Sequence, residues 1–257
     1  MKNITTLLIL AFTSLINAND IKEHISYELG PEIYYYRYEE PDIMEQDGVF
    51  TGIKGAITYE KNISIKLDGI YAQGKTDYSS YRTGSMNDCN NYMYDIRALI
   101  GLPRHYYNND TVIIHRYIGF GYRTLFDESE GQQSTTGHFG YNRKSDYYYM
   151  PIGISAKYKI FNRIETHSEI EFDWLLTGIQ HSYMGYLSPR DYDITNYQDF
   201  GYGIRISTDF IYQTEKVNLG FRPFLRYWSI NDSDIDMGFI EPANNTLEAG
   251  LSITAQF

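Results

Sequence analysis

The final segment of the chain carries the most restrictive pattern in the sequence, because its apolar and polar residues alternate strictly. From Leu247 to Phe257 every second residue is apolar, and the residues between them are small, polar or charged. A period of two places successive side chains on opposite faces of a β-strand. The segment therefore predicts a strand with one apolar and one polar face that ends on an aromatic residue.

Nine further segments show the same alternation, at about 27–38, 49–60, 63–72, 92–102, 112–125, 147–160, 164–176, 200–212 and 217–230. Short connections at 61–62, 103–111, 161–163 and 213–216 alternate with longer ones at about 39–48, 73–91, 126–146, 177–199 and 231–245. Short turns on one side and long loops on the other are typical of antiparallel transmembrane barrels. The sequence predicts an all-β, up-and-down antiparallel barrel of about ten strands.

The direction of the two faces separates a membrane barrel from a soluble one. In segment 147–160, Ile152 and Ile154 share one face, and Ser155 and Lys157 share the other. A soluble barrel turns its charged face to water and its apolar face inward, whereas a membrane barrel does the reverse. The alternation alone fits both arrangements.

The N-terminal residues favour the membrane. Lys2 is followed by an apolar run that ends at Asn17-Ala18, which is typical of a secretory signal peptide. We therefore predict a signal peptide at 1–18 and one barrel domain at 19–257. The mean hydropathy of −0.44 does not oppose this prediction, because only alternate residues of a barrel strand face lipid.

Composition narrows the class further. The 27 tyrosines suit membrane–water interfaces, because each has an apolar ring and a polar tip. The formal net charge of −11 argues against nucleic acid as a partner. Cys89 is the one cysteine, so no disulfide framework exists. We expect Cys89 in an exposed, extracellular loop, open to thiol reagents.

Together these features resemble the small bacterial outer-membrane β-barrel superfamily that includes OmpA/OmpX-type barrels. Leu251, Ile253 and Phe257 correspond to the terminal assembly signal of such barrels. The resemblance implies a bacterial outer-membrane location with loops at the cell surface. It also implies contact with outer-membrane lipid and lipopolysaccharide, and insertion by the barrel assembly machinery.

The polar faces predict a charged lumen. Its proposed members are Lys157, Lys159, Glu165, His167, Glu169, Glu171, Asp173, Arg205, Arg222 and Arg226. Directly opposed residues of neighbouring strands lie about 5 Å apart, so these charges are expected to pair and to plug the lumen. The alternative is a narrow channel for small polar solutes.

Catalytic patterns are weak. Omptin proteases share the strand count and use paired aspartates with an Asp–His couple at the rim, but here His138 and His181 are the nearest candidates and were expected in loops. A lipid-modifying enzyme would need a Ser/His/carboxylate set, for which His167 with Ser155 is the candidate. Metal binding at His167, or of Ca²⁺ at 232–236, has no specific spacing. We therefore expect no cofactor.

The sequence best predicts a non-enzymatic outer-membrane barrel with a largely plugged lumen. Its expected role is surface exposure, envelope structure or adhesion, through loops rich in Tyr, Ser, Asn, Asp and Gly that suit an extracellular ligand. The channel and the rim hydrolase are the alternatives.

Overall fold

A computed structural model describes residues 24–107, 111–161, 163–187 and 192–257, so the predicted signal peptide lies outside the described residues. The strands are β1 (Ile25–Glu40), β2 (Met44–Glu60), β3 (Ser64–Ser80), β4 (Gly84–Gly101), β5 (His105–Tyr107), β6 (Val112–Glu128), β7 (Arg143–Phe161), β8 (Ile164–Ser182), β9 (Ile194–Gln198), β10 (Gly201–Tyr212), β11 (Asn218–Ile230), β12 (Ile235–Asp236), β13 (Phe239–Ile240) and β14 (Asn244–Gln256). Within this described part, the one helical element is a 3-10 turn at Met184–Tyr186, and no helix is long and apolar enough to cross a membrane.

Ten of these strands close into an antiparallel barrel. The order β1-β2-β3-β4-β6-β7-β8-β10-β11-β14 returns to its start because β14 pairs with β1. The short strands β5 and β9 extend the barrel wall at β6 and β8, and β12 pairs with β13 in a separate hairpin. The predicted fold is confirmed.

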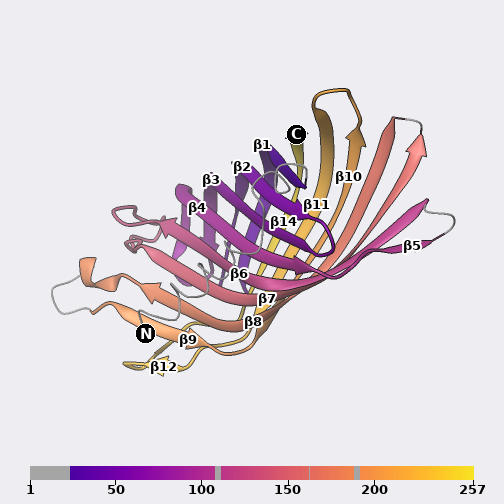
Figure 1. Ribbon diagram of the computed structural model, residues 1–257. Coiled ribbons are helices and arrows are strands. Elements are labelled where there is room, and N and C mark those ends of the chain that lie inside the picture. Colours follow the sequence, from indigo (N-terminus) through magenta and orange to yellow (C-terminus); the bar gives the residue numbers. More distant parts are fainter. Residues whose placement is uncertain (1–23, 108–110, 162, 188–191) are drawn as a thin grey trace.

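The connections place unlike structures at the two ends of the barrel. The C-terminal end and the β5 hairpin lie at one end, and β9 with the β12–β13 hairpin lies at the other (Figure 1). We call the end with the C-terminus the short-turn end, and the end with β9 and the β12–β13 hairpin the loop end.

The barrel strands are longer than the sequence predicted. β1 to β8, leaving aside β5, contain between 16 and 19 residues each, whereas about 9–11 tilted residues cross a bilayer. The predicted loops at 39–48 and 73–91 are wrong, because most of these residues extend β1–β4 and only 41–43 and 81–83 form the turns. The alternation continues there with reversed polarity, which makes a strand look like a polar loop.

The outer surface near the short-turn end is apolar. Leu29, Ile57, Ile154 and Ile253 lie there with exposed side chains, and their counterparts on the remaining strands are exposed as well. The interior holds buried charges instead, such as Glu171 with 1 % of its surface exposed. This arrangement is the opposite of a soluble barrel.

Tyrosines border this apolar belt. Tyr27 and Tyr212 are exposed near the short turns, and Tyr35 and Tyr71 are exposed about midway along their strands. Tyr is enriched at both membrane–water interfaces, because its ring is apolar and its hydroxyl is polar.

Beyond Tyr35, toward the loop end, the polarity of β1 reverses. Its inward-facing residues change from Glu28 and Glu32 to Tyr36 and Tyr38, while the outward side changes from Ile33 to Arg37 and Glu39. The interior of the loop-end half therefore contains buried aromatic rings, together with buried amides such as Gln46.

The segment around Phe257 closes the barrel. The backbone N–H of Tyr27 donates to Phe257 O at 2.8 Å, and the N–H of Phe257 donates to Tyr27 O at 3.0 Å. Their rings stack with centroids 6.2 Å apart. Leu251 and Ile253 point outward on the same strand. The proposed assembly signal thus lies in the seam between β14 and β1, and its role in assembly stays a prediction.

Cys89 is not in a loop, so that expectation is wrong. It lies in β4 with no exposed surface, and its Sγ is 3.3 Å from Gln132 Oε1. Burial raises the pKa of the Cys89 thiol to about 11. Since the thiolate is the reactive form, this thiol should label slowly.

Candidate functional site

A layer of charged side chains crosses the middle of the barrel, and Arg205 of β10 lies at its centre. Its Nη2 is 2.7 Å from Asp95 of β4, and its Nε is 2.6 Å from Asp173 of β8. The hydroxyl of Tyr149 donates to Asp95 at 2.6 Å. One guanidinium therefore joins strands on opposite sides of the lumen.

Three further arginines continue the layer. Arg226 contacts Glu248 at 2.8 Å and Glu32 at 3.0 Å, and Arg123, which has no exposed surface, also pairs with Glu248. Arg97 contacts Asp68 at 2.8 Å and pairs with Glu171. Such buried charges are stable only when each has close partners, and these pairs supply them.

Aromatic rings pack directly against these arginines. Trp228 lies edge-on to Tyr149 at 5.0 Å, and the guanidinium of Arg205 lies 5.3 Å from the Tyr149 ring centre. The Tyr149 ring fits because Gly121 faces it, since a Cβ on Gly121 would lie 2.1 Å from Tyr149 Cζ. We call this charged and aromatic layer the plug. Its members are Glu32, Tyr34, Asp68, Asp95, Arg97, Arg123, Tyr147, Tyr149, Glu171, Asp173, Arg205, Arg226, Trp228 and Glu248.

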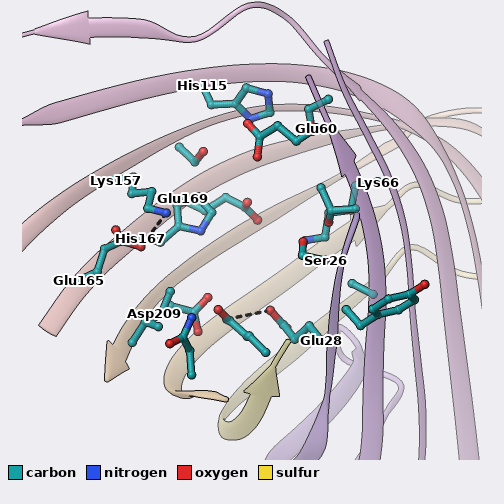
Figure 2. Close-up of a pocket in the computed structure, with 18 of the residues that line it drawn as sticks. Ser26, Glu28, Glu60, Lys66, His115, Lys157, Glu165, His167, Glu169 and Asp209 are labelled. Carbon is teal, nitrogen blue, oxygen red and sulfur yellow. Dashed lines mark hydrogen bonds and ion pairs between the residues drawn. The ribbon is translucent and has the colours of Figure 1, made fainter. Parts of the chain in front are cut away.

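A polar cavity of about 490 Å³ lies between the plug and the short-turn end, and we call it the vestibule (Figure 2). Lys157 pairs with Glu165 at 2.7 Å on one wall, where His167 and Glu169 also lie. On another wall Lys54 contacts Glu28 at 2.9 Å. The vestibule is thus lined by charges of both signs.

The structure divides the predicted lumen residues between these two sites. Glu171, Asp173, Arg205 and Arg226 belong to the plug. The vestibule is lined by Lys157, Glu165, His167, Glu169 and Arg222. Lys159 is exposed near the short-turn end. Lys157 pairs with Glu165, the first of the four predicted acidic residues of β8, rather than with those further along the strand. Arg222 pairs with Asp209 and Glu28.

A second cavity, of about 420 Å³, lies at the loop end, and we call it the cup. Its wall includes Phe139, Phe239 and Ile240, each with about half or more of its surface exposed. Loop residues 129–142 reach across to the β3–β4 turn, where Thr136 Oγ1 donates to Thr83 O at 2.7 Å. Gly84, at φ +78°, permits that close approach, since a Cβ there would lie 2.6 Å from Thr135 Oγ1.

The floor of the cup is acidic. Arg143 contacts Glu40 at 2.6 Å and Glu241 at 2.5 Å, so one cation serves two carboxylates. Asp127 lies beside them and accepts from Gln46 Nε2 at 2.7 Å. Burial raises the pKa of Glu241, although the nearby Arg143 opposes this shift. The floor therefore holds more negative than positive charge.

Sequence reasoning missed the cup, because Glu40, Arg143 and Glu241 fell in or beside predicted loops, and no local spacing marks them as partners. It also missed the aromatic part of the plug. The available signal was that Tyr147 and Tyr149 alternate with the outward-facing residues of β7 and so must point into the lumen.

The predicted catalytic histidines do not form one site with carboxylates. His138 Nδ1 lies 3.0 Å from Thr136 Oγ1 in the cup. His181 is the last residue but one of β8 rather than part of a loop, which corrects its predicted position. Its Nε2 is 3.9 Å from Asp146 Oδ2, and this pair lies beside Lys144 rather than among the residues that line the cup.

No cluster of three or more metal-ligating side chains occurs in the described residues. Three aspartates of the 232–236 segment instead tie loops together. Asp232 accepts from the Ala243 N–H at 2.6 Å, Asp234 from the Tyr197 N–H at 2.6 Å, and Asp236 from the Thr195 N–H at 3.3 Å.

Comparisons with known proteins bear on the fold. No family model and no curated protein matches the sequence. The structure is similar to the outer membrane protease OmpT of Escherichia coli, with a TM-score of 0.62 and 14% identity over 91% of this chain and 97% of that one. The translocator domain of the autotransporter NalP from Neisseria meningitidis matches with a TM-score of 0.43 and 9% identity over 98% of both chains. The similarity to OmpT shows that the chain has the fold of a bacterial outer-membrane barrel.

Proposed function

We propose that this protein is an integral outer-membrane barrel with a closed lumen that acts at the cell surface by binding a ligand in the cup. The observation that carries the proposal is the plug, which separates the cup from the vestibule. With the lumen closed, the two cavities cannot serve as the two mouths of one channel.

The apolar belt supports the membrane location. Leu and Ile side chains that point away from a polar interior would face water in a soluble protein, which costs roughly 25 cal/mol per Å² of apolar surface. Hydrocarbon removes that cost, and the exposed tyrosines mark the two edges of the belt. The loop end then faces the outside of the cell, because the short turns face the periplasm.

The chemistry of the cup supports binding at that end. Apolar walls with a few convergent polar groups are typical of ligand sites. The acidic floor at Glu40, Asp127 and Glu241 favours a ligand with a positive charge next to an apolar part. A surface peptide with a basic and an apolar side chain has this chemistry, which agrees with a role in adhesion.

Two measurements test the proposal. Purified, folded protein in a planar bilayer should show no steady current above background, and a large, stable conductance would make the channel the better interpretation. In the second measurement, a fluorescent Lys/Leu peptide should bind the wild type more tightly than Glu241→Gln. Arg37→Gln, outside the cup, should bind like the wild type. Equal binding by all three proteins would exclude the cup.

The same peptide mixture also tests the rim hydrolase. Mass spectrometry of the peptide after incubation should find it intact. Cleavage by the wild type would replace simple binding with catalysis at the loop end.

A further inference from the structure

We propose that Arg116 on the outer face of the barrel, positioned by His105, binds the phosphate group of a phospholipid whose acyl chain lies in the adjoining groove. This site is separate from the plug, the vestibule and the cup. It rests on one part of the proposed function, namely that the belt lies in a membrane.

Arg116 lies on the lipid-facing side of β6. The next residues of that outward row are Ile118 and Phe120, both exposed, and Tyr117, between Arg116 and Ile118, is buried in the interior. Across the strands, Arg116 is paired with Ile154, and its backbone oxygen accepts from the N–H of Leu102 at 2.8 Å. A cation therefore lies in the part of the apolar belt that is nearer the short-turn end, where an uncompensated charge is unfavourable.

His105 of β5 positions this arginine. One Nη of Arg116 is in hydrogen-bond contact with His105 Nε2, and both side chains are exposed. A guanidinium can only donate, so His105 accepts through Nε2. The remaining N–H groups of Arg116 are then available to phosphate oxygens. In the described part of the chain, no carboxylate pairs with Arg116.

A groove of about 600 Å³ begins at Arg116 and continues over β6, β7 and β8. Its side chains are almost entirely apolar and include Leu102, Ile118, Ile152, Ile154, Ile170 and Phe172. A single polar end and a long apolar floor match a phospholipid, which joins one anionic phosphodiester to acyl chains.

The position of the site relative to the membrane–water interface agrees with this ligand. Tyr106 and Tyr107 follow His105 in the short-turn hairpin, and both are exposed, as expected of residues at a membrane–water interface. Arg116 lies slightly further into the belt and can extend its head group toward that interface. The short-turn end faces the periplasm, so the phosphate would come from the periplasmic leaflet.

Native mass spectrometry of the detergent-purified barrel tests the site with phosphatidylglycerol. The wild type should retain one lipid at least tenfold more tightly than Arg116→Gln, and His105→Ala should be intermediate. Arg37→Gln, an exposed arginine at the loop end, should behave like the wild type. Slower gel mobility after boiling than before would show that each variant is folded.

Two further probes identify the source of the anion. Diacylglycerol, which lacks phosphate, should be retained weakly, and inorganic phosphate should not displace the lipid at millimolar concentration. Equal retention of phosphatidylglycerol by Arg116→Gln, equal retention of diacylglycerol, or displacement by inorganic phosphate would each overturn the proposal. The conductance and peptide-binding results would be unaffected by such a failure, so the proposed function is tested separately.

Discussion

In the half of the barrel near the short turns, the exposed side chains are mainly Leu, Ile and Phe, and the interior is charged. In the half near the loops, the exposed side chains include Arg37, Glu39 and Lys75, and the interior contains Tyr36, Phe50 and Met93. The same strands form both halves, and their hydrogen-bond register continues through the change.

This reversal shows how the surrounding solvent determines which face of a strand is apolar. Backbone pairing is satisfied equally in both halves, so the burial of side chains decides the pattern. With the belt in a membrane, as proposed, the apolar residues near the short turns would face hydrocarbon, and the charges would pair within the lumen. Near the loops the outside would face water, which agrees with the buried aromatic residues of that half.

The two tryptophans provide the largest expected contrast, between the interior of the barrel and its outer face. Trp228 has 1 % of its surface exposed and packs inside, whereas Trp174 has 53 % exposed on the outer face. Trp228→Ala should destabilise the barrel by about 3–5 kcal/mol, because it leaves a cavity in a packed interior. Trp174→Ala should cost clearly less, because lipid can fill the space. Urea unfolding in detergent or vesicles measures both, and equal losses would contradict the assignment of the two environments.

A new positive charge should distinguish the two outer surfaces. Ile152→Arg places the charge in the apolar belt, further from the short turns than Arg116, and should cost about 2–4 kcal/mol if the site lies near the bilayer midplane. Ser79→Arg, on the exposed outer side of β3 near the loop end, should change stability by less than about 0.5 kcal/mol. If both variants fold in lipid vesicles with the same stability, the belt does not lie in the membrane.

Neighbouring glutamates of β8 distinguish the plug from the vestibule. Glu171 pairs with Arg97 and lies 3.2 Å from Arg205 Nε, whereas Glu169 forms no ion pair recorded in the described residues. Glu171→Gln should lower the unfolding free energy by about 1.5–3 kcal/mol, because charged hydrogen bonds are lost in a buried site. Glu169→Gln should change it by less than about 0.5 kcal/mol. Thermal unfolding compares these equally sized variants, and a larger loss for Glu169→Gln would reverse the assignment.

The effect of acidity on the cup should be smaller. Burial raises the pKa of Glu241 above its ordinary value near 4.5, with Arg143 opposing this shift. The folded state then holds this proton more tightly than the unfolded state. The resulting stabilisation is complete below the ordinary pKa and is lost as pH rises through the raised pKa.

Hydrogen exchange in the β12–β13 hairpin, corrected for intrinsic rates, should therefore show greater protection at pH 4.5 than at pH 7.5. Glu241→Gln is the control, because it removes the ionisable group and should remove most of the difference. A hairpin that is better protected at pH 7.5 would mean that the ionised carboxylate is the stabilised form.

The sequence was sufficient to predict the barrel because alternation is a local property. A period of two was enough to predict that Ile152 and Ile154 lie on the opposite face of the strand from Ser155, and the structure confirms the resulting fold. The extensions of β1–β4 could not be predicted in the same way, because a hydropathy pattern that reverses within a strand resembles the end of that strand. Cys89 was misplaced for this reason.

The sites depend on contacts that the local pattern does not contain. Lumen-facing charges such as Glu171 and Arg205 could be selected by their face, but their partners are set by the stagger of the strands around the barrel. The cup joins Glu40 of β1 to Arg143 of β7 and Glu241 beyond β13, which are distant in the chain. No periodicity in the sequence marks such a group.

The seam between β14 and β1 has a consequence for how the chain can be rearranged. Its hydrogen bonds join residues as far apart in the chain as Tyr27 and Phe257, yet the seam is paired like any other two neighbouring strands. The barrel wall is therefore a ring in which no strand is geometrically first. A circular permutant that links the two sides of the seam and opens the chain at 213–217 would preserve every strand pair. The order of strands along the gene would then be separable from their order around the wall.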